Sequence, residues 1–383
     1  MLLILYIISD KYISMEMLMN YLNDLEKIIN INSYTKNKSG VDKVGQIMSK
    51  WLKDISFEET TFEREEIGNH QLFTTKRKDK RKNILLLGHN DTVFPPNTFE
   101  GFTQDETWVY GPGVCDMKGG NIVALEALRN IYKENNEISN IDFLIVSDEE
   151  SGSDDSKFVT LDIAKNYDYC FVFEAAGKEL EIVTGRKGVG TFTITIEGIP
   201  AHAGTSYTKG VDANLEASYK LQKLSALTNL ELGTTVNVGK IEGGIGANTI
   251  SPKCEMIVEI RYTSNSEKER LLSSLNQIVE TSYIKGTKAK LDGLIQRDVM
   301  EANENQEILI KQLETITNTK ILTEKRGGVS DANHVSSCGV TTLDGWGPFG
   351  DGDHTKKERA LKQTFTKRIE MMTSILSFFQ TKQ

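Results

Sequence analysis

Residues 83–91 read Asn-Ile-Leu-Leu-Leu-Gly-His-Asn-Asp, and this stretch indicates the fold of the chain. Its uninterrupted apolar run is typical of a strand buried on both faces of a sheet, as in parallel α/β sheets. The run ends at Gly88, and two polar side chains, His89 and Asp91, follow at once. In open α/β sheets, binding sites form outside the carboxyl ends of the strands. The stretch therefore predicts both a central strand and a site at its end.

Two more stretches repeat the pattern of an apolar strand followed by acidic residues. Residues 141–146 lead into Glu149 and Glu150, and residues 169–173 lead into Glu174. Adjacent carboxylates repel each other unless a cation neutralises them. A solvated acidic turn is the competing interpretation of residues 148–155. The repetition favours a functional edge of the sheet, because three strands end in His or acidic residues.

A glycine-bounded loop, residues 111–120, reads Gly-Pro-Gly-Val-Cys-Asp-Met-Lys-Gly-Gly and precedes a predicted helix over 121–132. Glycine allows other groups to approach the backbone closely. The loop presents one carboxylate, Asp116, whose two oxygens can bridge two cations.

The chain has five histidines, of which two lie in settings that suggest chemistry. His89 and Asp91 are two residues apart on an extended segment, so they point the same way, and Asp91 can orient the ring of a metal-bound His89. His354 lies in a glycine-rich loop, residues 347–355. Each histidine taken alone is more often structural than catalytic. Together with the strand-end carboxylates they predict a metal site.

Length and pattern predict two domains, because 383 residues exceed one simple core. The early segments predict helices over 15–31 and 39–55 and strands over 57–62 and 71–75. After residue 181 the segments follow the β-α-β-β-α-β order of a ferredoxin-like unit: 189–197, 212–227, 234–241, 254–262, 267–283 and 289–295. The α/β pattern of the segments before residue 181 then returns, with a helix over 306–317, a strand over 340–343 and a helix over 358–379. The predicted division is a catalytic domain of residues 1–184 and 297–383 with an insertion of residues 185–296.

Composition narrows the class of protein. The net charge of −9 argues against a nucleic-acid surface. The four cysteines show no metal-ribbon or disulfide spacing, which favours a cytoplasmic location: Cys115, Cys170, Cys254 and Cys338. The apolar run of residues 1–8 is too short to span a membrane and is a poor signal peptide, and Met15 or Met17 is an alternative start. We therefore expect no membrane partner.

The successive motifs resemble those of the dinuclear zinc carboxypeptidase and aminoacylase family, which includes glutamate carboxypeptidase, acetylornithine deacetylase, succinyl-diaminopimelate desuccinylase and peptidase T. The resemblance runs from about Tyr21 to the C-terminus and rests on residues 88–93, 111–120, 148–152, 173–174 and 352–355. It implies an α/β/α sandwich catalytic domain with an inserted ferredoxin-like α+β lid that forms a homodimer.

The resemblance also implies roles for individual residues. Asp116 would bridge two Zn²⁺ ions, for which Co²⁺ or Mn²⁺ can substitute. His89 and Glu174 would complete one ion, and Glu150 and His354 the other. Glu149 would be the general base, and Asp91 would orient His89. His202, in the motif at 198–204, would donate to the oxyanion. Arg261 and Asn248 would hold the substrate carboxylate.

These residues predict a hydrolase that cleaves an amide bond next to a free carboxylate and releases a C-terminal glutamate or a similar amino acid. The resemblance within the family is strongest to the glutamate carboxypeptidase branch. An N-acyl amino acid deacylase or a dipeptidase is the alternative with the same chemistry. A metal-bound but inactive binding protein is a third reading, which the complete ligand set disfavours. Residues 185–190 lack the context of a phosphate-binding loop, which excludes a nucleotide-binding α/β protein.

Overall fold

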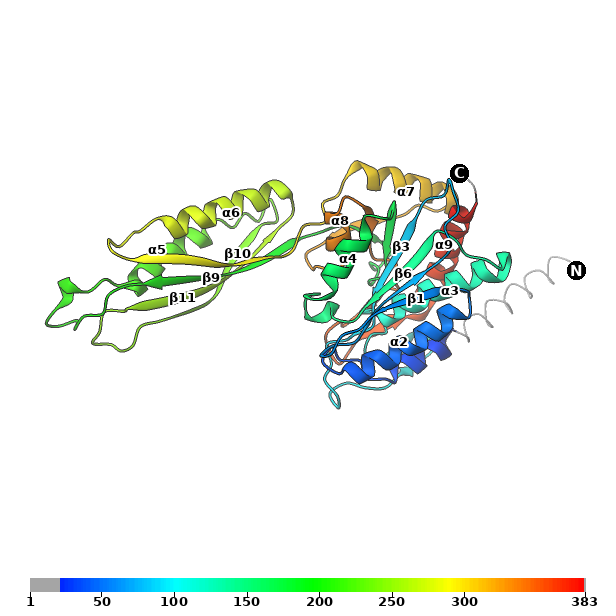
Figure 1. The fold of residues 1–383 in the computed structure, drawn as a ribbon, viewed down its shortest axis with the longest axis horizontal. Helices are drawn as coiled ribbons and strands as arrows, with labels where there is room; N and C mark the ends of the chain where they lie inside the picture. The colour runs from blue at the N-terminus through cyan, green and yellow to red at the C-terminus, as the bar shows by residue number, and fades with distance from the viewer. Residues whose placement is uncertain (1–20, 382–383) are drawn as a thin grey trace, which may run out of the picture. The chain divides into compact units, whose positions relative to one another are not determined.

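The computed structural model describes residues 21–381, which form two compact units (Figure 1). Of the described residues, the first unit comprises 21–184, 302–325 and 330–381, and the second comprises Gly185–Glu301 and Arg326–Val329. The second unit runs past residue 296, where the sequence placed its end, because the backbones of Arg186 and Met300 exchange two hydrogen bonds of 3.0 and 3.1 Å.

The first unit is built on a six-stranded sheet. Its strand order is β1 (Glu58–Phe62), β2 (His70–Thr74), β6 (Ile141–Val146), β3 (Ile84–His89), β7 (Tyr169–Val172) and β14 (Thr341–Leu343). The strands β6, β3, β7 and β14 are parallel, whereas β2 pairs antiparallel with β6 and β1 pairs antiparallel with β2. Every residue of β3 and β6 is buried, as the apolar runs predicted.

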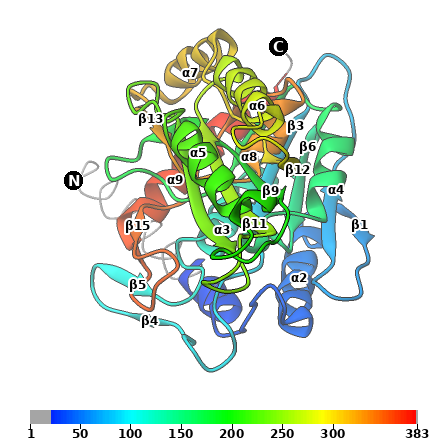
Figure 2. The ribbon, with the colours of Figure 1, turned by 90° about the vertical axis from the view of Figure 1, so that its left-hand side faces the viewer.

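Helices cover both faces of this sheet, which confirms the α/β sandwich (Figures 1 and 2). Alternate strand residues point to opposite faces, so Ile84 and Leu86 join the large core whereas Leu85 and Leu87 are buried on the other side. The large core includes residues 21–29, which are helical, and side chains of α2 (Lys38–Lys53), α3 (Lys118–Asn135), α7 (Glu304–Thr317) and α9 (Lys362–Gln380). The opposite face carries α4 (Ser156–Ala164) and α8 (Ala332–Ser337), which pack together.

The second unit has the ferredoxin-like order that the sequence predicted. It consists of β9 (Gly188–Glu197), α5 (Ala213–Ser225), β10 (Thr235–Gly243), β11 (Lys253–Tyr262), α6 (Asn265–Glu280) and β12 (Lys288–Arg297). The antiparallel sheet has the order β10-β11-β9-β12, and both helices pack on one face of it around a separate apolar core.

A small antiparallel sheet in the first unit joins segments that are far apart in the chain. It contains β15 (Gly350–Asp351), β16 (Arg359–Leu361), β5 (Trp108–Tyr110) and β4 (Thr103–Gln104). The predicted helix over 358–379 was therefore wrong at its start. Residues of β16 pair with β5 instead, and α9 begins at Lys362. This pairing carries the hairpin β15–β16 to the glycine loop that follows β5.

The remaining elements are short: η1 (Glu149–Ser151), η2 (Tyr207–Lys209), and the paired strands β8 (Ile182–Arg186) and β13 (Thr323–Arg326). The predicted helix over 15–31 is observed for residues 21–29, and its first part lies outside the described residues. Among the helices of residues 21–381, none has the length and apolar character needed to cross a membrane.

Candidate metal centre

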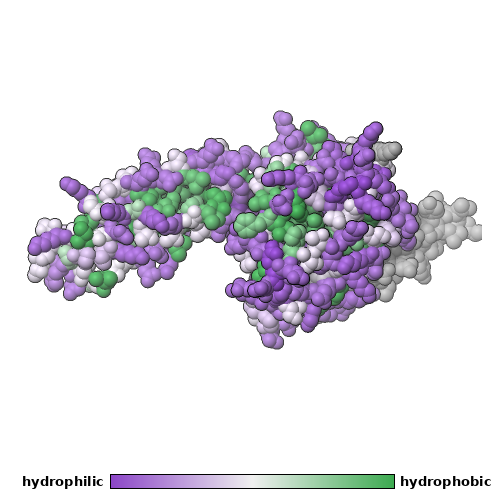
Figure 3. Space-filling view, viewed as in Figure 1, coloured by the Kyte–Doolittle hydropathy of each residue, from purple (hydrophilic) through white to green (hydrophobic). Residues whose placement is uncertain are grey.

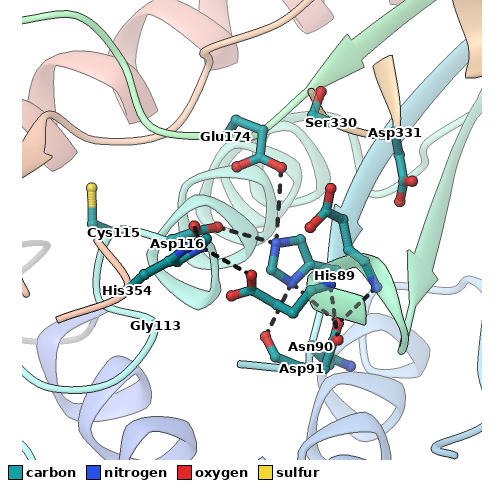
Figure 4. Close-up of polar contacts among 12 residues, drawn as sticks. His89, Asn90, Asp91, Gly113, Cys115, Asp116, Glu174, Ser330, Asp331 and His354 are labelled. Atoms are coloured by element: carbon teal, nitrogen blue, oxygen red, sulfur yellow. Dashed lines mark hydrogen bonds and ion pairs between the residues drawn. The ribbon is translucent and has the colours of Figure 1, made fainter. Parts of the chain in front are cut away.

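The carboxyl edge of the large sheet gathers the predicted ligands (Figure 4). His89 is the last residue of β3, Glu149 and Glu150 open η1 after β6, and Glu174 lies two residues after the end of β7. These three strands are neighbours in the sheet, so their ends lie side by side. The side chains that the local sequence pattern placed at strand ends thus lie close together in the structure.

Asp116 lies between the two predicted histidine ligands. Its Oδ1 is 3.2 Å from Nε2 of His89, and its Oδ2 is 3.1 Å from Nε2 of His354. Zinc–ligand bonds of about 2.0–2.2 Å place two ligand atoms on one tetrahedral ion about 3.3 Å apart. Each oxygen of Asp116 therefore has the spacing from one histidine that a shared ion requires.

Two more carboxylates complete the surroundings of the histidines. Oε1 of Glu174 lies 3.8 Å from Nε2 of His89, and Oε2 of Glu150 lies 3.0 Å from Nε2 of His354. Among the described residues, the groups with ligand atoms close enough for one metal ion are His89 with Asp116 and Glu150, and His89 with Glu149 and Glu174. The five predicted ligand residues and Glu149 thus lie together.

Asp91 orients His89 and also holds the loop after β6. Its Oδ1 is 3.3 Å and its carbonyl oxygen 3.0 Å from Nδ1 of His89, so this nitrogen donates its proton and Nε2 faces Asp116. The backbone N–H groups of Glu149 and Glu150 donate to the two Asp91 oxygens at 3.3 and 3.2 Å. One buried carboxylate therefore sets the position of a histidine and of two glutamates.

The pKa shifts in the cluster show that its carboxylates have too little positive charge around them. Burial, together with the charge of Asp116, raises the pKa of Glu150 to about 8. Burial also raises the pKa of Glu174 well above its usual value. Hydrogen bonds to Asp116 and Glu150 raise the pKa of His354 to about 11.

The pKa of Asp116 itself moves the other way. Burial would raise this pKa, but hydrogen bonds from His354 and His89 lower it below its usual range. Burial would lower the pKa of His89, but hydrogen bonds to Asp116 and Asp91 raise it well above its usual value. Protons thus occupy the cluster where positive charge is needed, and divalent cations would displace them. The nitrogen and oxygen donors fit such cations.

Three supporting residues were not identified from the sequence. The Thr35 hydroxyl donates to Asp91 Oδ2 at 2.6 Å, and the Asn121 side chain donates to the His89 carbonyl at 2.8 Å. Glu358 accepts hydrogen bonds from the loop that carries Asp116. None of the three lies in a motif that was predicted to bind metal, and only the folded backbone reveals them.

Comparison with known proteins shows which family the chain resembles. The model of the peptidase dimerisation domain of M20 proteins matches residues 184–287. Carboxypeptidase G2 of Pseudomonas sp. strain RS-16 is 27% identical over 344 residues, covering 87% of this chain and 82% of that protein. The chain is thus similar to M20 peptidases over most of its length.

Other M20 relatives span nearly the whole chain. Succinyl-diaminopimelate desuccinylase of Coxiella burnetii is 23% identical and covers 94% of this chain and 98% of that protein. The aminopeptidase PepT of Bacillus cereus has a similar fold, with a TM-score of 0.79, 21% identity, and coverage of 95% of this chain and 99% of that one. These similarities confirm the predicted family resemblance, and the fold agrees with it.

The second unit of this chain carries the predicted substrate residues. Nδ1 of His202 accepts the backbone N–H groups of Gly204 and Thr205 at 3.1 and 3.2 Å. The proton of the neutral ring is therefore on Nε2, which is a hydrogen-bond donor. Arg261 donates from Nε to Glu259 at 2.8 Å and from Nη1 to the Gly327 carbonyl at 3.2 Å. Asn248 is exposed in a loop.

Proposed function

We propose that this chain is a two-metal hydrolase that cleaves an amide bond next to a free carboxylate. The position of Asp116 carries the proposal, because each of its oxygens faces a different histidine, at 3.2 and 3.1 Å. We propose Zn²⁺ as the resident metal, since imidazole and carboxylate donors in this number suit zinc. Co²⁺ or Mn²⁺ would substitute.

The residues of the cluster divide the chemistry between them. Bound divalent cations would supply Lewis acidity that lowers the pKa of water and polarises the scissile carbonyl. Glu149, beside His89 and Glu174, takes the proton of the attacking water and passes it to the leaving amine. His202, through its Nε2–H, donates to the oxyanion that develops in the transition state.

We propose that the substrate ends in a free carboxylate, with glutamate as the preferred released residue. The similarity to carboxypeptidase G2, with 27% identity over 87% of this chain, supports this choice. Arg261 would bind the carboxylate, with Asn248 beside it, because a guanidinium suits bidentate pairing with a carboxylate. Nη2 of Arg261 makes a long interaction of 3.4 Å with Oε2 of Glu259.

A substrate panel tests the proposal. The zinc-loaded full chain should release free glutamate from pteroyl-glutamates and other N-acyl-glutamates, and amidation of the α-carboxylate should abolish the release. The R261A variant should raise KM more than it lowers kcat. Equal cleavage of the amidated substrate would exclude a role for the carboxylate. Two bound ions without turnover of any substrate would instead indicate a binding protein.

Deacylation of N-acyl amino acids is the second candidate. Succinyl-diaminopimelate desuccinylase covers 94% of this chain at 23% identity, which supports a substrate with an acyl group such as succinyl. Dipeptide hydrolysis uses the same centre. Assays of N-acetyl and N-succinyl amino acids and of dipeptides, run beside the glutamate substrates, separate these activities by their kcat/KM values.

We propose that the chain is a homodimer through residues 185–301. The match of residues 184–287 to a peptidase dimerisation domain supports this. The second unit exposes apolar side chains on α5 and on the neighbouring edge strand β10: Leu215 at 41%, Tyr219 at 44% and Ile241 at 48%. Figure 3 shows apolar surface on this unit among hydrophilic residues.

Sedimentation velocity tests the dimer. The double variant L215E/I241E should sediment as a monomer, because charge on an apolar interface is costly. The matched control F158E changes a side chain of the first unit that is 67% exposed, and it should remain dimeric. A dimeric double variant would exclude this surface.

A further inference from the structure

Glu358 connects two loops that carry proposed metal ligands. It follows His354 by four residues and directly precedes β16, yet it is only 1% exposed. Its Oε1 accepts the backbone N–H groups of Gly113, Cys115 and Asp116 at 3.0, 3.0 and 3.1 Å, and Oε2 makes a second contact with Gly113 at 3.1 Å. A carboxylate with three backbone donors restrains the path of the loop that supplies them.

The backbone of Glu358 contacts both loops as well. Its N–H donates to the Thr355 carbonyl at 3.2 Å, which belongs to the hairpin of His354. Its carbonyl accepts from the N–H of Gly111 at 3.4 Å, at the start of the Asp116 loop. One residue therefore links segments that are 242 positions apart in the sequence.

The spacing of two ligands depends on this link. His354 is on a surface hairpin, its side chain is 59% exposed, and its φ of 60° lies in the left-handed region. Such a conformation persists in a residue other than glycine only where its surroundings enforce it. The hairpin reaches Asp116 through the pairing of β16 with β5 and through Glu358.

We propose that Glu358 is a positioning residue, which clamps the Asp116 loop to the His354 hairpin and so sets the spacing of the two ligands that share one divalent cation. The proposal rests on the proposed two-metal function. Glu358 contacts the backbone of the loops and acts only through Asp116 and His354. Its effect comes from accepting hydrogen bonds, which keep the loop in place before any metal binds.

Two substitutions separate hydrogen bonding from charge. In E358Q, an amide oxygen at the place of Oε1 keeps the contacts with Gly113, Cys115 and Asp116 and loses only the contact at Oε2. In E358A, all four contacts of the side-chain oxygens with Gly113, Cys115 and Asp116 are lost. If hydrogen bonds act, the glutamine variant should resemble the wild type although it lacks the charge.

Metal affinity is the first measurement. Metal-free full chain is titrated with Zn²⁺ against a chromophoric chelator. E358A should bind one of the two ions about 10–100-fold more weakly, the usual effect of removing a residue that orients ligands. E358Q should stay within a few-fold of the wild type. Equal affinities in E358A and the wild type, or equal losses in E358Q and E358A, would overturn the clamp.

Asp142 provides a matched control for general loss of stability. It is fully buried and accepts the N–H of Thr75 at 2.9 Å, but it is the second residue of β6 and so lies at the strand end away from Glu149. D142N should lower the unfolding temperature without changing either zinc affinity. Equal weakening in D142N and E358A would show that only stability is involved and would overturn the clamp.

Hydrogen–deuterium exchange of the metal-free chain tests the clamp without metal or activity. Peptides covering residues 111–118 should exchange faster in E358A than in the wild type, E358Q or D142N. Unchanged exchange in E358A would overturn the clamp. If the wild type binds fewer than two ions, the proposed function fails, while the exchange result still decides the clamp.

Discussion

The two histidines of the centre are held in different ways. His89 is 1% exposed at the end of a buried parallel strand, with Asp91 behind it. The His354 side chain is 59% exposed on a hairpin that is attached by a few backbone contacts. We call the proposed metal ligands His89 and Glu174 the strand-end ligands, and the proposed ligand His354 the hairpin ligand.

The difference teaches how a two-metal site can be assembled from unequal parts. The core fixes the strand-end ligands, because moving them would disturb strands that are buried on both faces. The hairpin ligand depends on a small surface sheet and on Glu358. The free energy of local unfolding varies across a structure, and it is low where segments are held by exposed backbone contacts. We therefore expect the two proposed ions to differ in how firmly they are held.

The largest expected effect comes from Glu149, which lies beside the strand-end ligands. E149Q should lower kcat by about 10²–10⁴-fold, because general acid–base catalysis contributes that much, while two ions remain bound. Steady-state assays and elemental analysis measure these quantities. D154N is the control, since the Asp154 side chain is 80% exposed in the same acidic segment. If E149Q kept full activity, Glu149 would not be the base.

A smaller effect is expected for Asp91. D91N should weaken one bound ion by about 10–100-fold, because Asp91 orients His89 and holds the backbone of Glu149 and Glu150. T35V removes only the hydroxyl that donates to Asp91 at 2.6 Å, so its effect should be smaller. Competition titrations with zinc rank the variants. Full affinity in D91N would contradict the rigid strand-end ligands.

The rate of metal release tests whether the strand-end ligands hold their proposed ion more firmly than the hairpin ligand holds the other. After addition of excess chelator, we expect two phases, with the ion of the exposed hairpin ligand leaving first. H354Q should accelerate the fast phase several-fold and leave the slow phase unchanged, while H89Q should change the slow phase. Stopped-flow measurements with a chromophoric chelator resolve the phases. A single phase, or acceleration of the slow phase by H354Q, would show that both ions are held alike.

The smallest expected effect is on stability as the pH changes. In the metal-free chain, the raised pKa values of Glu150 (about 8) and His354 (about 11) mean that the folded state binds protons that the unfolded state has released. Stability should therefore fall as the pH rises from about 5 to about 11, with the contribution of Glu150 lost by about pH 8 and that of His354 lost by about pH 11. The lowered pKa of Asp116 acts only in more acidic solution.

Metal reverses this trend, because its ligands must be deprotonated. The difference in unfolding temperature between the zinc-loaded and metal-free chain should widen from about pH 5 to about pH 8 by several degrees. Thermal scans with and without zinc measure it. E150Q should flatten the fall in the metal-free chain. A constant difference would mean that the cluster binds no extra protons without metal.

Periodicity in the sequence identified most of the fold. The boundaries of β6 were predicted without error, and the six elements of the second unit appear in the expected order. The short elements β4, β5, β15 and β16 were not predicted, because two- and three-residue strands carry no period. The predicted helix start at residue 358 was wrong because β16, whose residues Arg, Ala and Leu all favour helix, directly precedes α9.

By itself, the sequence located the proposed strand-end ligands at the edge of the sheet, because apolar strands and the polar residues that follow them are neighbours in the chain. Only the tertiary structure decided how His354 meets Asp116 and why Glu358 is buried. Those contacts join residues that are 238 and 242 positions apart. No local pattern encodes such pairs, because they form only when β16 adds to β5 and the glycine loop closes on the carboxylate.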